Sequence, residues 1–195
     1  MNSEYDYLLK VVLNGDDNVG KYSIFKRFCE NEMGEKLSCG LIEMKNKSIS
    51  CFGKTVKLQI WYNNQEKLKT TSGAFYKGTH IVIVVFDITS RESFVNLQKY
   101  LSEIKEYKLS DAAILLLGNK SDMEQQRIVS YEEAQKFADL NNIEYLETSA
   151  KSPTNIDEAF QFSTQLCLVK FQKKYEEYKA SQENKLKQME ESAKK

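Results

Sequence analysis

Residues Tyr7–Lys21 are YLLKVVLNGDDNVGK, an apolar run that leads directly into a loop with glycine at both ends and a lysine after it. The run Tyr7–Leu13 predicts a strand, and Lys21–Glu30 predicts a short helix behind the loop. A Gly-x-x-x-x-Gly-Lys loop in this context turns its backbone N–H groups inward, with the helix N-terminus behind them. The segment therefore predicts a phosphate-binding loop whose lysine reaches the terminal phosphates. The alternative is a glycine turn without function, which this strand–helix context makes the weaker of the two.

The rest of the chain alternates strand-like and helix-like stretches. The runs His80–Phe86 (HIVIVVF) and Ala112–Leu117 (AAILLL) are continuously apolar, as in strands buried on both faces of a parallel sheet. Ile42–Cys51 and Thr55–Trp61 flank a glycine-containing turn, Phe52–Lys54, and predict a hairpin. The order predicts an α/β fold: a doubly wound sheet of six strands, mostly parallel with one antiparallel strand, and about five helices.

Three capping signatures predict where later helices begin. Thr89 with Glu92 predicts a helix that runs to about Tyr107, and Ser130 with Glu133 predicts one over YEEAQKFADL. A weaker acidic variant, Thr154 with Asp157, precedes the last helix. The segment Ile143–Thr148 between the last two helices predicts the final strand.

Composition limits the class of protein. The 195 residues carry 28 Lys+Arg and 28 Asp+Glu, so the zero net charge argues against a nucleic-acid partner. No run approaches the roughly 18 apolar residues that a membrane span needs, and the N-terminus lacks the pattern of a signal peptide. The four cysteines fit neither a zinc site nor a disulfide framework: Cys29, Cys39, Cys51 and Cys167. We expect a cytoplasmic protein.

A polar cluster follows the Ala112–Leu117 run, at the edge where doubly wound sheets bind ligands. The Asp122 carboxylate can accept from two adjacent donors, which guanine presents and adenine does not. Asn119 can serve the opposite edge of the base, and the stem of Lys120 can cover the ring. The segment Glu147–Lys151 can aim backbone N–H groups at the same base. In the alternative interpretation, these residues only brace loops at the edge of the sheet.

These segments resemble the small GTPases of the Ras superfamily, and the Rab branch most closely. The similarity includes GKTVKLQIW, FYKGTHIVIVVFDITSRESF, GNKSD and LETSAK, and it extends over about residues 4–170. It implies the small-GTPase fold and a bound guanine nucleotide, GTP or GDP. The expected nucleotide-binding residues are Gly15, Asp17, Asn18, Val19, Gly20, Lys21, Tyr22, Ser23, Asn119, Lys120, Asp122, Ser149, Ala150 and Lys151.

The chain departs from the family at the magnesium ligands. The family has Ser or Thr after the loop lysine, and that hydroxyl binds Mg²⁺. Tyr22 stands at this position, with its hydroxyl too far from the backbone, and Ser23 points elsewhere on the helix. The switch threonine that supplies a second ligand aligns with Cys39, whose neutral thiol suits a hard cation poorly. We expect weak or absent magnesium binding.

The catalytic segment departs further. The family has Trp-Asp-Thr-Ala-Gly-Gln-Glu where this chain has Trp-Tyr-Asn-Asn-Gln-Glu (61–66), so the metal-coupled aspartate is replaced and one residue is missing. Gln65 matches the glutamine that orients water, but without the surrounding geometry we expect it to be non-functional. Asp17 adds a carboxylate beside the terminal phosphates and favours GDP, while Asn18 replaces a glycine. We expect weakened nucleotide binding and slow or absent hydrolysis.

The C-terminal stretch, residues 171–195, contains neither Gly nor Pro, and 12 of its 25 residues are charged. We expect a Rab-like domain over 1–170 and a charged helical extension over 171–195. Several residues of the extension share one helical stripe: Phe171, Tyr175, Tyr178, Leu186 and Met189. The stripe is either one side of a solvated tail or a seam for a protein partner. The chain ends in Lys rather than in prenylated Cys, so we expect no lipid anchor.

Three hypotheses of function remain from the sequence. The first is a Rab-like guanine-nucleotide-binding protein with impaired hydrolysis, which acts as an interaction module through the switch face or the C-terminal helix. The second is a nucleotide-free structural subunit of a larger assembly. The third is an active GTPase switch in vesicle traffic with rewired metal ligands.

Overall fold

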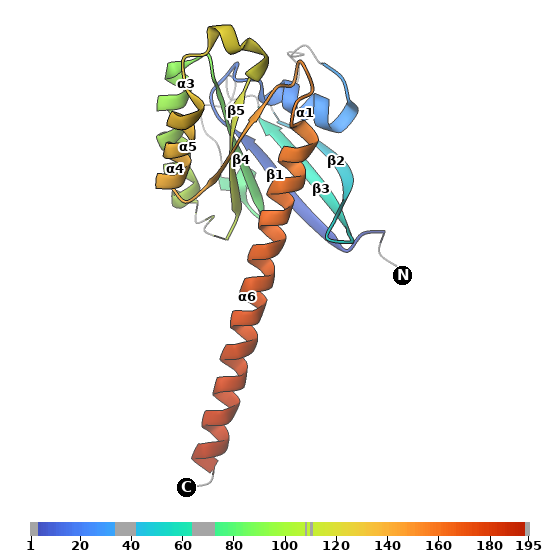
Figure 1. Cartoon of the computed structure of the whole chain (residues 1–195). Helices are drawn as coiled ribbons and strands as arrows, with labels where there is room; N and C mark the ends of the chain where they lie inside the picture. The colour runs from blue at the N-terminus through green and yellow to red at the C-terminus, as the bar shows by residue number, and fades with distance from the viewer. Residues whose placement is uncertain (1–3, 34–41, 64–72, 108, 110, 194–195) are drawn as a thin grey trace.

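The structure is a computed structural model of the whole chain, and it describes residues 4–33, 42–63, 73–107, 109 and 111–193 (Figure 1). Side chains are described as far as residue 182. Gln65 and Cys39 therefore lie outside the described residues, as do the side chains of Leu186 and Met189.

In the described part of the chain, six strands form one sheet in the order β2-β3-β1-β4-β5-β6. Only the β2–β3 hairpin is antiparallel, and β1 pairs in parallel with both β3 and β4. This arrangement confirms the predicted α/β fold. The strands are β1 (Tyr7–Asn14), β2 (Ile42–Cys51), β3 (Lys54–Asn63), β4 (Ile81–Asp87), β5 (Ala113–Asn119) and β6 (Glu144–Thr148).

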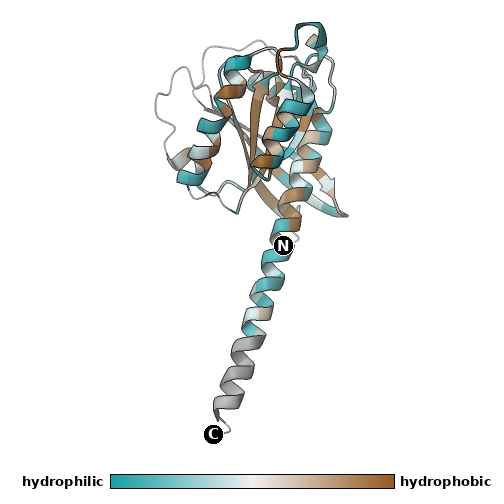
Figure 2. Cartoon of the chain, turned by 60° about the vertical axis from the view of Figure 1, so that its left-hand side comes forward, coloured by the Kyte–Doolittle hydropathy of each residue, from teal (hydrophilic) through white to brown (hydrophobic). Residues whose placement is uncertain are grey.

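Helices cover both faces of the sheet and enclose its apolar strands (Figure 2). On one face, α1 (Lys21–Glu30) and the first turns of α6 (Ile156–Ala193) pack through Phe28 and Phe160, whose rings stack at 3.7 Å. The second core lies beneath the other helices. These are α2 (Gly73–Tyr76), α3 (Arg91–Val95), α4 (Leu97–Glu106) and α5 (Tyr131–Leu140).

The helix expected after β4 begins one residue later than predicted and is divided in two. Ser90, not Thr89, is the N-cap of α3, and its hydroxyl accepts from the backbone N–H of Ser93. The Thr89 hydroxyl instead donates to Asp87 at 2.7 Å. Asn96 separates α3 from α4. The S/T-x-x-E pattern selected the wrong residue because a local turn already used Thr89.

The other two helix starts differ in outcome. Ser130 caps α5 as predicted, accepting from the N–H of Glu133 at 3.1 Å. Thr154 lies two residues before α6 begins, and its hydroxyl donates to the Ser152 carbonyl at 3.2 Å. Its backbone forms a bridge with Ser149, which is why it does not cap the helix.

The helix α6 continues without interruption from the body of the molecule to Ala193 and projects as a rod beyond the sheet (Figure 1). Phe171 is half-buried against the core and meets His80 edge-on at 5.9 Å. Tyr175 and Tyr178 are exposed, at 67% and 63%. The structure thus divides the predicted stripe into an inner residue and outer ones. No described helix is long and apolar enough to cross a membrane.

Candidate nucleotide-binding site

The glycine-rich loop joins β1 to α1 in a shape that depends on its glycines. Gly15 has φ 130°, and a Cβ there would lie 2.1 Å from the Val85 carbonyl oxygen. Gly20 has φ 97°, and a Cβ there would lie 2.2 Å from Nδ2 of Asn119. Asn18 adopts φ 61°, in the left-handed region that Asn tolerates. The loop therefore packs closely on both β4 and β5, as the motif predicts.

Lys21 lies at the start of α1 with its side chain 4% exposed. Its ammonium donates to the backbone carbonyls of Gly15, at 2.6 Å, and Asp16, so it spans the mouth of the loop. The first turn of α1 contains no acidic residue, and Gly20 provides no side-chain cap. The N-terminal N–H groups and this ammonium together favour an anion.

Asp16 anchors the loop from the other side. Its carboxylate accepts from Asn96 Nδ2 at 2.7 Å and from the Tyr100 hydroxyl at 2.6 Å. Burial, followed by the bond to Asp16, raises the pKa of Tyr100, which keeps this hydroxyl a donor. Sequence reasoning missed both partners because they lie 80 and 84 residues away.

Asn119, at the end of β5, links the loop to the predicted base-binding segments. It is 2% exposed. Its Nδ2 donates to the Val19 carbonyl at 2.8 Å, and its Oδ1 accepts from the Thr148 hydroxyl at 3.3 Å. One side chain therefore fixes three segments: the loop, the end of β5 and the end of β6.

The remaining base-side residues form a second hydrogen-bonded group. The Ser149 hydroxyl donates to Oδ1 of the exposed Asp122 at 2.6 Å and accepts from the Ser152 N–H at 3.0 Å. Ala150 is buried, with its carbonyl accepting from Arg27 Nε at 3.0 Å. Lys151 is exposed. The structure thus brings the two predicted base motifs together through Asp122 and Ser149.

Lys120 has a partner that sequence reasoning missed. Its ammonium pairs with Oδ2 of Asp87 at 2.6 Å, and Asp87, at the end of β4, is 6% exposed. Lys120 itself adopts φ 70°. The signal was present in the sequence, because Asp87 directly follows the apolar run that predicted β4. This pair fixes the stem of Lys120 beside the loop.

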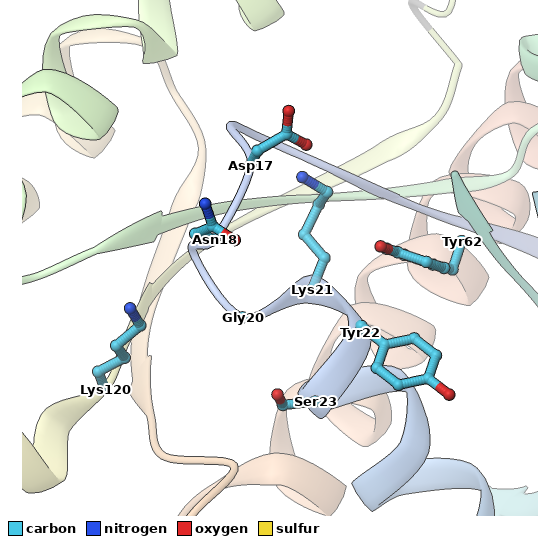
Figure 3. Close-up of a pocket in the computed structure, with 8 residues that line it drawn as sticks. All are labelled: Asp17, Asn18, Gly20, Lys21, Tyr22, Ser23, Tyr62 and Lys120. Carbon is cyan, nitrogen blue, oxygen red and sulfur yellow. The ribbon is translucent and has the colours of Figure 1, made fainter. Parts of the chain in front are cut away.

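A pocket of about 260 Å³ lies between the loop and the end of β3 (Figure 3). Most of the predicted phosphate-side residues line it, and so does Tyr62, which was not among the predicted nucleotide-binding residues. The Lys21 ammonium points toward Asp17 (Figure 3). Ser23 lies on another side of α1. The pocket is lined by Asp17, Asn18, Gly20, Lys21, Tyr22, Ser23, Tyr62 and Lys120.

Aromatic packing forms the β3 side of this pocket. Tyr22 is 8% exposed and Tyr62 is 5% exposed, with their ring centroids 5.4 Å apart. Phe25, one turn along α1, lies 6.0 Å from the Tyr62 ring and 6.4 Å from the Tyr22 ring. Such a contact is worth roughly 0.5–1.5 kcal/mol per pair beyond area burial. The contact between Tyr22 and Tyr62 joins α1 to the end of β3.

The described residues around this pocket do not fit a magnesium ion. In P-loop GTPases the ion is held by a Ser or Thr of the loop and by an Asp at the end of a strand. Tyr22 follows the loop lysine, and Tyr62 follows Trp61 at the end of β3. Among the described residues, no group of three or more His, Cys, Asp or Glu side chains is placed to hold a metal. At the two positions where the family has oxygen ligands, this chain has tyrosine rings that pack against each other.

Comparison with known proteins agrees with this architecture. The Ras family model matches residues 10–169. The chain belongs to the Ras family. Over 162 residues it is 44% identical to GTP-binding protein ypt1 of Schizosaccharomyces pombe, with 82% of this chain and 80% of the relative covered. It is 43% identical, over the same share of the chain, to GTP-binding protein YPT1 of Saccharomyces cerevisiae (79% of which is covered) and to Ras-related protein RABD2a of Arabidopsis thaliana (80% covered). This Ras-family chain is therefore Rab-like.

Proposed function

We propose that this Rab-like chain binds a guanine nucleotide, with the phosphates at the Gly15–Lys21 loop and the base at Asn119–Asp122 and Ser149–Lys151. The observation that carries the proposal is the Asn119 side chain, which bonds both Val19 of the loop and Thr148 beside the second base motif. In the alternative, the same bonds only brace loops at the edge of the sheet, and the chain binds no nucleotide. Two of the relatives are named GTP-binding proteins, which supports the proposal.

The chemistry of base recognition follows from donors and acceptors. Ser149 occupies Oδ1 of Asp122, which keeps the carboxylate fixed. An ionised carboxylate is an acceptor only, so it favours a base edge that presents two adjacent donors. Guanine has such an edge and adenine has none. A base without this donor edge would leave the Asp122 carboxylate unpaired, and that penalty rejects a wrong base more strongly than shape does.

Thermal unfolding of the full chain tests the proposal. A ligand that binds only the folded state raises the melting temperature, by mass action. Millimolar GDP is expected to raise it by several degrees, and equal ADP is expected to leave it unchanged. No shift with GDP would support the nucleotide-free structural subunit instead.

Hydrolysis is a finer question, with two hypotheses. The similarity to GTP-binding Rab-type relatives favours an active GTPase switch in vesicle traffic. Tyr22 and Tyr62 favour slow hydrolysis, because the charge of the transition state lacks a well-placed metal. Cys39 and Gln65, the other two positions in this argument, lie outside the described residues. The preference for GDP over GTP is part of the slow-hydrolysis hypothesis and rests on Asp17.

Single-turnover GTP hydrolysis in magnesium decides between them. Slow hydrolysis predicts a rate below the ~10⁻⁴ s⁻¹ of an unassisted family member. An active switch predicts a rate at or above it. Restoring the family residues in Tyr22→Ser/Tyr62→Asp should raise the rate if the tyrosines are responsible. Tyr175→Ser, at an exposed position of α6, is the matched control for loss of a tyrosine.

The exposed Tyr175 and Tyr178 support a proposed contact with a protein partner along the outer part of α6. The division into a domain at 1–170 and an extension at 171–195 also remains a proposal. Deletion of residues 183–195 is expected to leave GDP binding unchanged. A loss of binding would show that the extension belongs to the nucleotide-binding domain.

A further inference from the structure

The two tyrosines of the pocket come from segments that the fold brings together. Strands β1 and β3 are parallel, and Leu13 of β1 is paired with Tyr62. The strand β1 continues into the loop, and α1 then returns Tyr22 to the end of β3. The positions of the expected loop hydroxyl and strand-end carboxylate are therefore neighbours in space, as a metal site requires.

The contact between the rings puts aromatic carbon where the family has two oxygen ligands. Mg²⁺ keeps near-ideal octahedral geometry with oxygens at about 2.0–2.1 Å, and it retains several waters. Tyr22 and Tyr62 are 8% and 5% exposed, and their centroids are 5.4 Å apart. The two replacements also suit each other, because either ring would lose one of its two aromatic neighbours if the other position held Ser or Asp. Phe25 completes the cluster.

The charge of the pocket leaves one other candidate ligand for an ion. Among its described lining residues, Asp17 is the only carboxylate, and the cations are Lys21 and Lys120. Mg²⁺ in nucleotide sites is usually held by one or two carboxylates together with phosphate oxygens, so the test below includes Asp17. The buried Lys21 ammonium already lies against the loop carbonyls, where it can meet phosphate oxygens.

We infer that guanine nucleotide binds to this chain without magnesium, because Tyr22 and Tyr62 stand where the family has the hydroxyl and the carboxylate that hold the ion. The inference rests on the proposed function and specifies how that site holds phosphate. In a metal-dependent site, chelating the ion releases the nucleotide. In this chain, chelation leaves nucleotide release unchanged.

Release of a fluorescent GDP analogue from the full chain tests the inference, with unlabelled GDP in excess and either millimolar magnesium or excess EDTA. The two release rates are expected to agree within twofold. The variant Tyr22→Ser/Tyr62→Asp is expected to release the analogue at least tenfold more slowly in magnesium than in EDTA. Tyr22→Phe keeps the ring and is expected to stay insensitive to EDTA.

Two results would overturn the inference. EDTA accelerating release tenfold or more in the unmodified chain would show that an ion is held in spite of the tyrosines. If Asp17→Asn then abolished that acceleration, the ion would be assigned to Asp17. Absence of GDP binding in both buffers would reject the proposed function, and this inference with it. If the double variant does not fold, the unmodified chain and Tyr22→Phe still decide the question.

Discussion

The predicted base-binding segments are held together by hydrogen bonds between side chains and neighbouring segments, whereas aromatic packing lines the pocket where the family places its metal. Asn119 bonds Val19 and Thr148, and Asp122 accepts from Ser149. Tyr22 and Tyr62 instead contact each other. Under the proposed function, one half of the site keeps hydrogen-bonding side chains while Tyr22 and Tyr62 in the other half belong to the core.

Asn119→Ala is expected to have the largest effect. It removes bonds to Val19 and Thr148 inside the protein and leaves their buried groups unpaired, at about 1–3 kcal/mol each. GDP affinity should fall about 100-fold, equivalent to ~2.7 kcal/mol, and the urea midpoint should fall as well. Calorimetric titration and urea unfolding measure the two. Asn46→Ala, at an exposed position of β2, is the control. An equal loss of GDP affinity in that variant would show that the effect of Asn119→Ala is not specific to the base side.

Asp122→Ala tests base selection. The variant loses the acceptor pair for guanine, and a charged hydrogen bond contributes about 1.5–3 kcal/mol. The ratio of GDP to ADP affinity should fall about 30-fold with little loss of stability, since Asp122 is exposed. Competition against a fluorescent GDP analogue measures this ratio. An unchanged ratio would show that guanine is recognised elsewhere.

Lys21→Met tests the phosphate side. The variant removes one cation, and the loop loses its bonds to the Gly15 and Asp16 carbonyls. GDP affinity should fall about 10-fold, equivalent to ~1.4 kcal/mol. Calorimetric titration of Lys21→Met and Asn119→Ala with GDP in the same buffer compares their losses of affinity. If the loss exceeds that of Asn119→Ala, the phosphate side carries more of the affinity and the comparison is reversed.

Asp17→Ser is expected to have the smallest effect on GDP. Removing the carboxylate should instead raise GTP affinity relative to GDP by about threefold. The effect is small because the repulsion between Asp17 and a terminal phosphate near the protein surface is only a few kcal/mol before salt screens it. The ratio of the two dissociation constants measures it. An unchanged ratio would remove the basis for a GDP preference.

Much of the fold was predictable because it depends on local signals. Continuous apolar runs predicted β4 and β5 within a residue or two, and the Gly15–Lys21 spacing predicted the loop. The hairpin turn was also predictable, because Gly53 lies between two strand-like runs. In the structure Phe52 and Gly53 both adopt positive φ there. These features depend on a few adjacent residues and on a periodicity that the chain itself displays.

The parts that sequence reasoning missed depend on contacts between distant residues. Asp16 reaches Asn96 and Tyr100 across separations that no local pattern encodes. The position of Asp87 at the end of β4 was visible in the sequence, but its pairing with Lys120 depends on the pairing of β4 with β5. The tyrosines at the family's metal-ligand positions were visible in the sequence. That Tyr22 and its counterpart on β3 pack together emerged only from the pairing of β1 with β3.

Identification of the nucleotide in the purified chain tests the central claim most directly. Protein prepared in EDTA is heat-denatured, and whatever is released is separated by chromatography beside guanine and adenine standards. The account predicts GDP in near-stoichiometric amount, retained through the chelator. An empty protein, an adenine nucleotide, or GDP that is lost as soon as magnesium is removed would contradict it.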